Sequence, residues 1–352
     1  MDEVAGLDVE HAAERVTVAI LNYDGCDLLD IVVPSVLAQR HRGRVVVVDN
    51  GSRDGSAEHV KEHWPAVEVI RIPENIGVAA ALNRAVAAGD TEYLALLNND
   101  IELEPDWLGE LVAALDTHPE AAAASGKLLR YHEREIIDSA GDLLLWSSAV
   151  LNRGAGERDR GQFDEPGRVF AACAGAALYR RSAFELVGGF DESFFAYAED
   201  IDWGTRAQLL GLSARYTPTA IGYHVGGATT GKRPRLYIRC QRRNQLTLAI
   251  KSFPTSALLR HGWKIVVNQL LTLAASVRDR TLMALLHGWF DVLVRLPATL
   301  RARRKIQRSR VVGTRELDAL ISASLPTGGS RLRRLLFELA PQAASRSRSE
   351  RS

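Results

Sequence analysis

Four apolar runs alternate with segments of helical periodicity in the first hundred residues. The runs cover residues 15–21, 45–48, 67–72 and 94–97. Short runs rich in valine, isoleucine and leucine predict buried strands. Strands that alternate with helices form mostly parallel sheets, because each right-handed crossover returns the chain to the same edge. The sequence therefore predicts an α/β fold with a mostly parallel sheet.

Each run ends in asparagine, aspartate or glycine. Asn22 closes the first run, Asp49 the second, Asn75 and Gly77 follow the third, and Asn98-Asn99-Asp100 follows the fourth. Ligands of open α/β sheets bind at the carboxyl ends of the strands. Asp and Asn oxygens suit Mg²⁺ or Mn²⁺, although both residues are also common in turns. These positions are therefore candidates for a nucleotide and metal site.

Two familiar phosphate-binding loops are absent from the sequence. No Gly-x-Gly-x-x-Gly follows the first run, and the chain has no Walker motif. A bound phosphate would then be held mostly by a metal and not by a glycine loop. This reasoning favours Asp100 as a metal ligand over Asp100 as a turn residue.

A second acidic cluster opens a predicted helix after an aromatic loop. Glu199, Asp200 and Asp202 lie in its first turn. Acidic side chains at the start of a helix interact favourably with its dipole and stabilise the helix by about 0.3–1 kcal/mol each. Three of them, however, exceed what a helix cap requires. A carboxylate next to rings that can stack on a sugar can act as a general base toward a hydroxyl. His224, which ends a later short strand before Gly226, is either structural or a metal ligand.

Taken in this order, the motifs resemble the inverting GT-A glycosyltransferases of family 2, in particular the bacterial rhamnosyltransferase-like branch. The resemblance covers about residues 15–250 and is carried by residues 47–52, 74–77, 96–100, 188–195, 199–202, 224 and 226–227. It implies a GT-A fold, which is a Rossmann-like, nucleotide-binding fold with a mostly parallel sheet. A C-terminal helical extension would follow it.

The resemblance also implies roles for individual residues. Asp49 would contact the nucleobase, and Asp100 and His224 would hold Mg²⁺ or Mn²⁺ at the donor diphosphate. Asp200, paired with Glu199, would be the catalytic base. The residues that would bind the nucleotide are Asn22, Asp49, Asn75, Gly77, Asn83, Asn98 and Asn99. Asn98 stands where the family has the first Asp of Asp-x-Asp, so one carboxylate ligand is missing.

The implied reaction moves rhamnose or a similar hexose from a nucleoside-diphosphate sugar to a hydroxyl of a lipid-linked or cell-wall polysaccharide acceptor, with inversion. One alternative is a sugar nucleotidyltransferase, which would carry a glycine- and basic-rich phosphate loop where this chain has residues 22–25. Another is a non-catalytic glycan- or nucleotide-binding module, but Asp100, Asp200 and His224 are all present.

Charge is distributed unevenly along the chain. Residues 251–352 contain 19 Lys and Arg against 6 Asp and Glu, whereas residues 1–250 contain 25 against 37. The apolar windows 265–277 and 281–290 are shorter than the roughly 20 residues that span a bilayer. Amphipathic helices beside a basic cluster at 301–310 predict contact with a membrane surface through residues 255–310. A helical subdomain and a homodimer contact are the alternatives, and the net charge of +1 argues against nucleic acid.

The expected organisation has four parts. A flexible leader covers residues 1–14, the GT-A domain 15–250, a basic amphipathic helical region 251–340 and a disordered Ser/Arg tail 341–352. The acidic N-terminus does not have the sequence pattern of a signal peptide. The cysteines 26, 173 and 240 have no metal-ligand spacing and indicate a reducing compartment. We expect a cytoplasmic enzyme, peripheral on the inner face of the plasma membrane.

Overall fold

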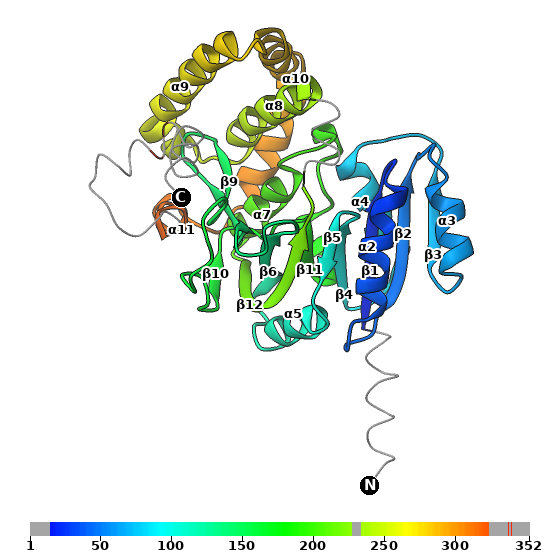
Figure 1. The fold of residues 1–352 in the computed structure, drawn as a ribbon. Coiled ribbons are helices and arrows are strands. Elements are labelled where there is room, and N and C mark those ends of the chain that lie inside the picture. Colours follow the sequence, from blue (N-terminus) through cyan, green and yellow to red (C-terminus); the bar gives the residue numbers. More distant parts are fainter. Residues whose placement is uncertain (1–14, 227–233, 324–336, 338, 340–352) are drawn as a thin grey trace.

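The computed structural model describes residues 15–226, 234–323, 337 and 339 (Figure 1). Its strands are β1 (Val16–Asn22), β2 (Arg44–Asn50), β3 (Glu68–Ile72), β4 (Tyr93–Asn98), β5 (Ile101–Leu103), β6 (Ala121–Arg130), β7 (Ile137–Ser139), β8 (Asp142–Leu144), β9 (Val150–Asn152), β10 (Gly167–Val169), β11 (Ala176–Arg180) and β12 (Ser213–His224). Its helices are α2 (Cys26–Leu37), α3 (Ser56–His63), α4 (Val78–Ala88), α5 (Trp107–Asp116), α6 (Arg181–Val187), the 3₁₀ turn η1 (Glu192–Phe194), α7 (Glu199–Leu209), α8 (Pro234–Ser252), α9 (Thr255–Arg278), α10 (Leu282–Ser309) and α11 (Thr314–Ala323).

One sheet organises the fold, with strand order β10-β12-β6-β11-β4-β1-β2-β3. The strands β3, β2, β1 and β4 run parallel, which confirms the predicted α/β class. Alternate residues of β1 face opposite layers: Val18 and Ile20 pack with α2, α3 and α5, whereas Ala19 packs with α4, α6 and α7. Burial on both faces explains why these strands read as continuous apolar runs.

β11 runs opposite to both of its neighbours, β4 and β6, whereas β6 and β12 beyond it run in the direction of β4. β12 therefore ends at the same edge as β1, β2 and β4. β5 pairs with the end of β12, with His224 opposite Ile101. This register places His224 next to Asp100.

Three later strands have bounds that depend on their surroundings. Within the small-residue segment 170–181 only β11 is a strand, because residues 170–175 turn toward the start of α7, where the Ala174 N–H binds Asp200. β6 begins in the small-residue run at Ala121. The strand ending in His224 has 12 residues and includes Pro218, which is tolerated at an irregularity between Thr217 and Ile221.

The C-terminal helices form an arch beyond the sheet (Figure 1). Part of this region shares a core with the sheet domain, since Phe253, Leu317 and Ile321 pack with Phe194 and Ile201. Position 250, the expected end of the catalytic domain, lies inside α8. Within residues 15–226 and 234–323, no helix combines the length and apolar character needed to cross a membrane. The expected leader at 1–14 and tail at 341–352 lie outside the described residues.

Candidate active site

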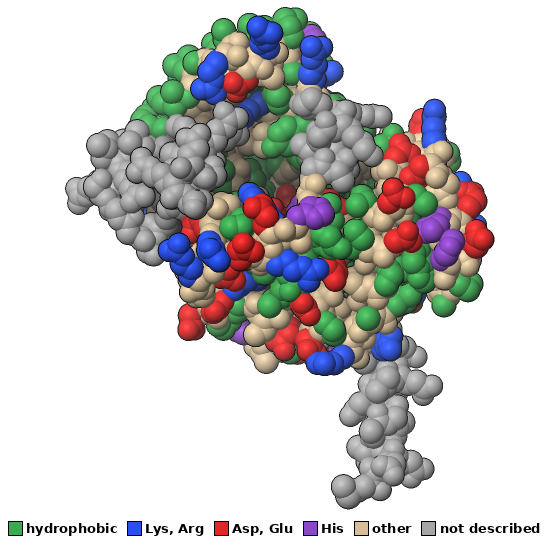
Figure 2. All heavy atoms as spheres, in the orientation of Figure 1, with side chains coloured by type: hydrophobic (Ala, Val, Ile, Leu, Met, Phe, Trp, Pro, Cys, Tyr) green, Lys and Arg blue, Asp and Glu red, His purple; other side chains and the backbone are tan. Residues whose placement is uncertain are grey.

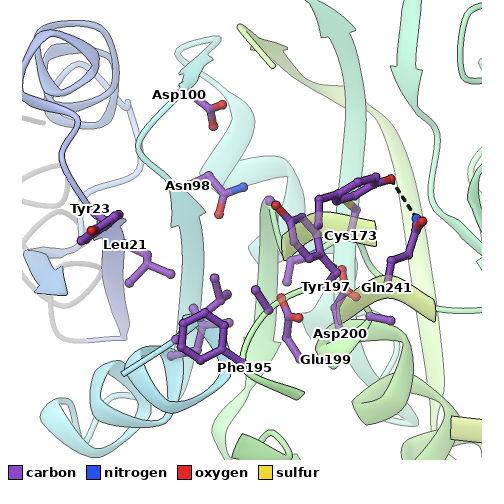
Figure 3. A pocket seen from close by; sticks show the side chains of 18 of the residues that line it. Leu21, Tyr23, Asn98, Asp100, Cys173, Phe195, Tyr197, Glu199, Asp200 and Gln241 are labelled. Atoms are coloured by element: carbon purple, nitrogen blue, oxygen red, sulfur yellow. Dashed lines mark hydrogen bonds between the residues drawn. The ribbon is translucent and has the colours of Figure 1, made fainter. Parts of the chain in front are cut away.

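A cavity of about 480 Å³ opens at the carboxyl edge of the sheet. Asn98 and Asp100 approach it from the end of β4, and Glu199 and Asp200 from the start of α7 (Figure 3). α8 completes the wall with Tyr237, Gln241 and other residues. Two acidic groups from distant parts of the chain thus face one space of a size that suits a small-molecule substrate.

Asp100 and His224 form the first polar group of the cavity. His224 Nε2 lies 3.3 Å from Asp100 Oδ2, and His224 Nδ1 lies 2.8 Å from Asp138 Oδ2. The backbone N–H of Val225 also donates to the Asp100 carbonyl at 2.9 Å. A carboxylate that binds one ring nitrogen fixes the tautomer and leaves the other nitrogen for a cation, the usual arrangement around metal-ligating histidines. These groups therefore suit a divalent metal.

The protonation of His224 follows from the same contacts. Burial lowers the pKa of His224, but the hydrogen bonds to Asp100 and Asp138 outweigh burial and raise this pKa to about 10. Without a cation, the imidazole is therefore charged and pairs with the two carboxylates. A divalent cation would replace the Nε2 proton, so its binding would release a proton to solvent.

Amide side chains connect the ends of β1, β2 and β4. Asn99 Nδ2 donates to Asn22 Oδ1 at 2.6 Å, and Asn22 Nδ2 lies 3.4 Å from Asp49 Oδ1. Asn75 Oδ1 accepts from the Gly77 N–H at 2.9 Å. Gly77 has φ +90°, and a Cβ there would lie 2.6 Å from the Phe195 ring, so only glycine fits.

Glu199 and Asp200 form the second polar group and are largely buried. The N–H of Ile201 donates to Asp200 Oδ1 at 2.7 Å, and that of Ala174 to Asp200 Oδ2 at 3.2 Å. Burial and the charge of Asp200 raise the pKa of Glu199 to about 8. Burial also raises the pKa of Asp200, although its backbone hydrogen bonds oppose that shift. Acids with raised pKa values in a cleft are candidates for proton transfer.

The loop before these acids has an unusual backbone. Phe195, Tyr197 and Ala198 all have positive φ, at 64°, 71° and 65°. Such conformations cost about 1–3 kcal/mol each for residues with a side chain, so neighbouring contacts must hold them. Asn244 of α8 supplies these contacts, because its Nδ2 lies 3.0, 2.8 and 2.7 Å from the carbonyl oxygens of residues 194, 196 and 197.

A buried ion cluster lies next to the acidic turn of α7. Lys251 Nζ at the end of α8 lies 2.5 Å from Asp191 Oδ2 and 2.7 Å from Asp202 Oδ1. Asp202 also accepts from Arg206 Nε at 3.0 Å. The side chains of Lys251 and Asp202 are 2% and 0% exposed. Asp202 thus binds structural partners, in contrast to Glu199 and Asp200, which line the cavity.

The structure places most of the sequence-predicted residues in one cavity. The lining residues among them are Asn75, Gly77, Asn98, Asn99, Asp100, Glu199, Asp200 and His224. Asn22 and Asp49 are buried next to the cavity, in the amide network. Asn83 is not among the lining residues: its amide donates to the Phe190 carbonyl at 3.0 Å and accepts from the Phe190 N–H at 2.8 Å, which stabilises that loop, and its nucleotide contact stays a prediction.

Several lining residues were missed by the sequence analysis. They include Asp138 and Asp142, which flank the end of β7, and Cys173. Gln241 and Tyr237 of α8 were also missed; the Gln241 Nε2 donates to the Tyr237 hydroxyl at 2.8 Å (Figure 3). The only sequence signal for the missed residues was the close spacing of Asp138 and Asp142 around Ser139-Ala140-Gly141. Their position depends on pairing of β7 with β6, which local sequence does not reveal.

The chain is similar to known glycosyltransferases in sequence and in fold. Residues 17–188 match the family model "Glycosyl transferase family 2". The chain is 29% identical over 248 residues to N-acetylglucosaminyl-diphospho-decaprenol L-rhamnosyltransferase of Mycobacterium tuberculosis, covering 63% of this chain and 79% of that protein. It is 28% identical over 209 residues to the O-antigen biosynthesis protein RfbC of Myxococcus xanthus, covering 56% and 16%.

Solved structures share the fold. GalNAc-T7 with UDP, GalNAc and Mn²⁺ superposes with a TM-score of 0.58 at 16% identity, covering 74% of this chain and 51% of that one. The mannosyltransferase PcManGT from Pyrobaculum calidifontis, in complex with GDP-Man and Mn²⁺, gives a TM-score of 0.50 at 18% identity, covering 96% and 83%. The predicted GT-A fold is thereby confirmed. The chain thus contains a glycosyl transferase family 2 domain over residues 17–188 and is a glycosyltransferase.

Proposed function

We propose that this protein is a metal-dependent, inverting glycosyltransferase that moves rhamnose or a similar hexose from a nucleoside-diphosphate sugar to a hydroxyl of a lipid-linked or cell-wall polysaccharide acceptor. One observation carries the proposal: the Asp100–His224 group and the Glu199–Asp200 group line the same cavity. The first suits a diphosphate with its cation, and the second suits a reacting hydroxyl. The mycobacterial relative, an N-acetylglucosaminyl-diphospho-decaprenol L-rhamnosyltransferase, supports the sugar and the acceptor class.

The residues at the Asp100–His224 group fit Mg²⁺ or Mn²⁺. They offer carboxylate and amide oxygens and one imidazole nitrogen, a donor set that these ions accept. Manganese in the two solved glycosyltransferase structures supports the same assignment. When bound, such an ion would offset the charge that develops on the nucleoside diphosphate.

Asp200 would accept the proton of the acceptor hydroxyl as that oxygen attacks the anomeric carbon. Its two carboxylate oxygens are fixed by backbone N–H groups from α7 and from residue 174, so the base has a defined orientation. Attack from the face opposite the leaving group inverts the configuration in one displacement. The reaction then requires no enzyme nucleophile.

Mass spectrometry of the purified protein with a panel of nucleotide sugars tests the proposal. Slow release of nucleoside diphosphate from one sugar donor, dependent on Mn²⁺ or Mg²⁺, is the expected result. Transfer of the sugar to a polyprenyl-diphosphate acceptor would then establish the acceptor class. A protein that binds a sugar donor in calorimetry but never consumes it, even with acceptor, would be a binding module instead.

Replacing Asp100 with Ala is expected to lower sugar-donor turnover at least about 100-fold and to remove its response to added Mn²⁺, because the cation loses a carboxylate that faces the cavity. Initial rates over a Mn²⁺ titration measure this effect. The matched control is Asp90→Ala, at an exposed position. A variant with normal turnover and an unchanged metal response would remove Asp100 from the metal site.

We also propose that the C-terminal helices bind a membrane surface. Leu259, Trp263, Val266, Leu270 and Val277 share one side of α9 by helical spacing and are 84%, 49%, 58%, 59% and 60% exposed. Exposed basic residues, among them Arg301, Arg304 and Lys305, lie on α10. Hydrophobic and basic side chains gather over the helical part (Figure 2). An apolar stripe beside basic groups is typical of helices that lie in the membrane interface.

The double variant Leu259→Glu/Val266→Glu is expected to bind anionic vesicles at least about 10-fold more weakly, since two apolar side chains no longer enter the interface. Vesicle sedimentation measures this loss. Leu186→Glu is the matched control, because Leu186 is 60% exposed on α6, away from the stripe. Unchanged vesicle binding, or a change in oligomeric state alone, would point to a contact between protein copies.

A further inference from the structure

Three side chains converge behind the acidic turn of α7. Asp142 of β8, Cys173 and Asp200 offer ligand atoms that all lie within 4.8 Å of one another. Asp142 is 3% exposed, and its Oδ1 has no hydrogen-bond partner among the described residues. Neither Asp142 nor Cys173 has a part in the reaction described above. The burial of the Asp142 carboxyl group therefore calls for a physical explanation.

The two carboxyl groups of this cluster differ in their hydrogen bonds. Asp200 accepts from the backbone N–H groups of Ile201 and Ala174, which stabilise a negative charge. Asp142 interacts with the side chains of Ser139 and Cys173 and is fully enclosed. When two carboxyl groups lie as close together in a buried site as Asp142 and Asp200 do, ionising both costs a large free energy. One proton therefore remains on the pair, and the hydrogen bonds favour charge on Asp200.

We propose that Asp142 is a positioning residue for Asp200: its carboxyl group keeps the shared proton and donates it in a hydrogen bond to Asp200. Asp200 then remains the charged base, with its carboxylate held for the acceptor hydroxyl. The proton of Asp142 stays on Asp142 throughout, and the proton that Asp200 accepts is the one lost by the acceptor. This inference rests on the proposed function for its catalytic consequence.

The surrounding charges favour the same state. The titratable groups that face the pair are Asp138 from β7, Cys173, Tyr179 from β11 and Glu199 of α7. Burial raises the pKa of Asp142 well above its usual range, and the charges of Asp200 and Asp138 raise it further. Burial likewise raises the pKa of the Cys173 thiol, so Cys173 adds no charge near neutral pH.

Two substitutions at Asp142 test the proposal. Asp142→Asn keeps the shape and an N–H that can donate to Asp200, so it should retain kcat within about threefold, whereas Asp142→Ala should lose about 10²-fold in kcat with little change in KM. In the wild type, activity should fall on the alkaline side as Asp142 loses its proton. Asp142→Asn should lack that alkaline fall, because an amide does not titrate in this range.

An infrared measurement separates this proposal from the proposed function. At neutral pH, the wild-type spectrum minus that of Asp142→Asn should contain the carbonyl band of a protonated carboxyl group, because the band of Glu199 is present in both proteins and cancels. This holds whether or not any sugar donor is consumed. Absence of that difference band would overturn the proposal. So would an Asp142→Asn variant that is folded and as inactive as Asp142→Ala, since a required charge indicates a cation held by Asp142, Cys173 and Asp200.

Discussion

Asp200→Asn is expected to lower kcat for sugar transfer by about 10²–10⁴-fold, because the acceptor hydroxyl loses its base. The sugar donor should still bind, since the Asp100–His224 group is untouched. Because burial raises the pKa of Asp200, wild-type activity should fall with decreasing pH above the usual range of an aspartate. Product formation, calorimetry with the sugar donor and thermal unfolding together measure these effects.

Asp90→Asn provides the matched control, since it makes the same change at an exposed position. It should leave kcat and the pH profile unaltered. If Asp200→Asn turns over normally with acceptor, the proton is accepted elsewhere, and Glu199, which also lines the cavity, becomes the candidate base. A lower unfolding temperature in Asp200→Asn would instead assign the residue a structural part.

Lys251→Met is expected to lower the free energy of unfolding by about 3–5 kcal/mol. The substitution removes the cation that Asp191 and the fully buried Asp202 share and leaves Asp202 with Arg206 alone, and breaking a buried ion pair from one side costs more than the pair contributed. The ammonium also lies 4.7 Å from the centre of the Phe194 ring. Denaturant titration followed by circular dichroism measures the change.

The control is Lys61→Met on α3, which removes an exposed lysine. Surface substitutions of this kind usually change stability by less than about 0.5 kcal/mol. A loss below 1 kcal/mol for Lys251→Met would mean that water reaches the two aspartates and that the cluster contributes little.

The sheet and one half of the site could be predicted from local sequence. Strands buried on both faces produce continuous apolar runs, and parallel strands bring their polar ends to one edge. The residues Asn98, Asn99 and Asp100 were found for that reason, and they do line the cavity. Their assigned chemical roles are still proposals, because the fold positions these side chains without identifying what they bind.

The other half of the site depends on pairing between strands that lie far apart in the chain, which no local sequence pattern encodes. β12 pairs parallel with β6 and antiparallel with β5, which brings His224 to Asp100, 124 positions earlier in the chain. Asp138 and Asp142 reach the cavity only because β7 pairs with β6 and β8 with β9. The contacts of Asn83 are of the same kind, because its amide binds both backbone groups of Phe190, which lies 107 positions later in the chain.

The Asn244 contacts bear on how such enzymes can be recombined. The family match ends at residue 188, before the loop and the acids of α7, and the residue that fixes this loop lies on α8. A chimera joined anywhere between Asp200 and α8 would combine the strained loop of one protein with the α8 residues of another, in place of the Asn244 contacts that hold this loop. An exchange between relatives should therefore move residues 194–244 as one block, with the junctions outside it.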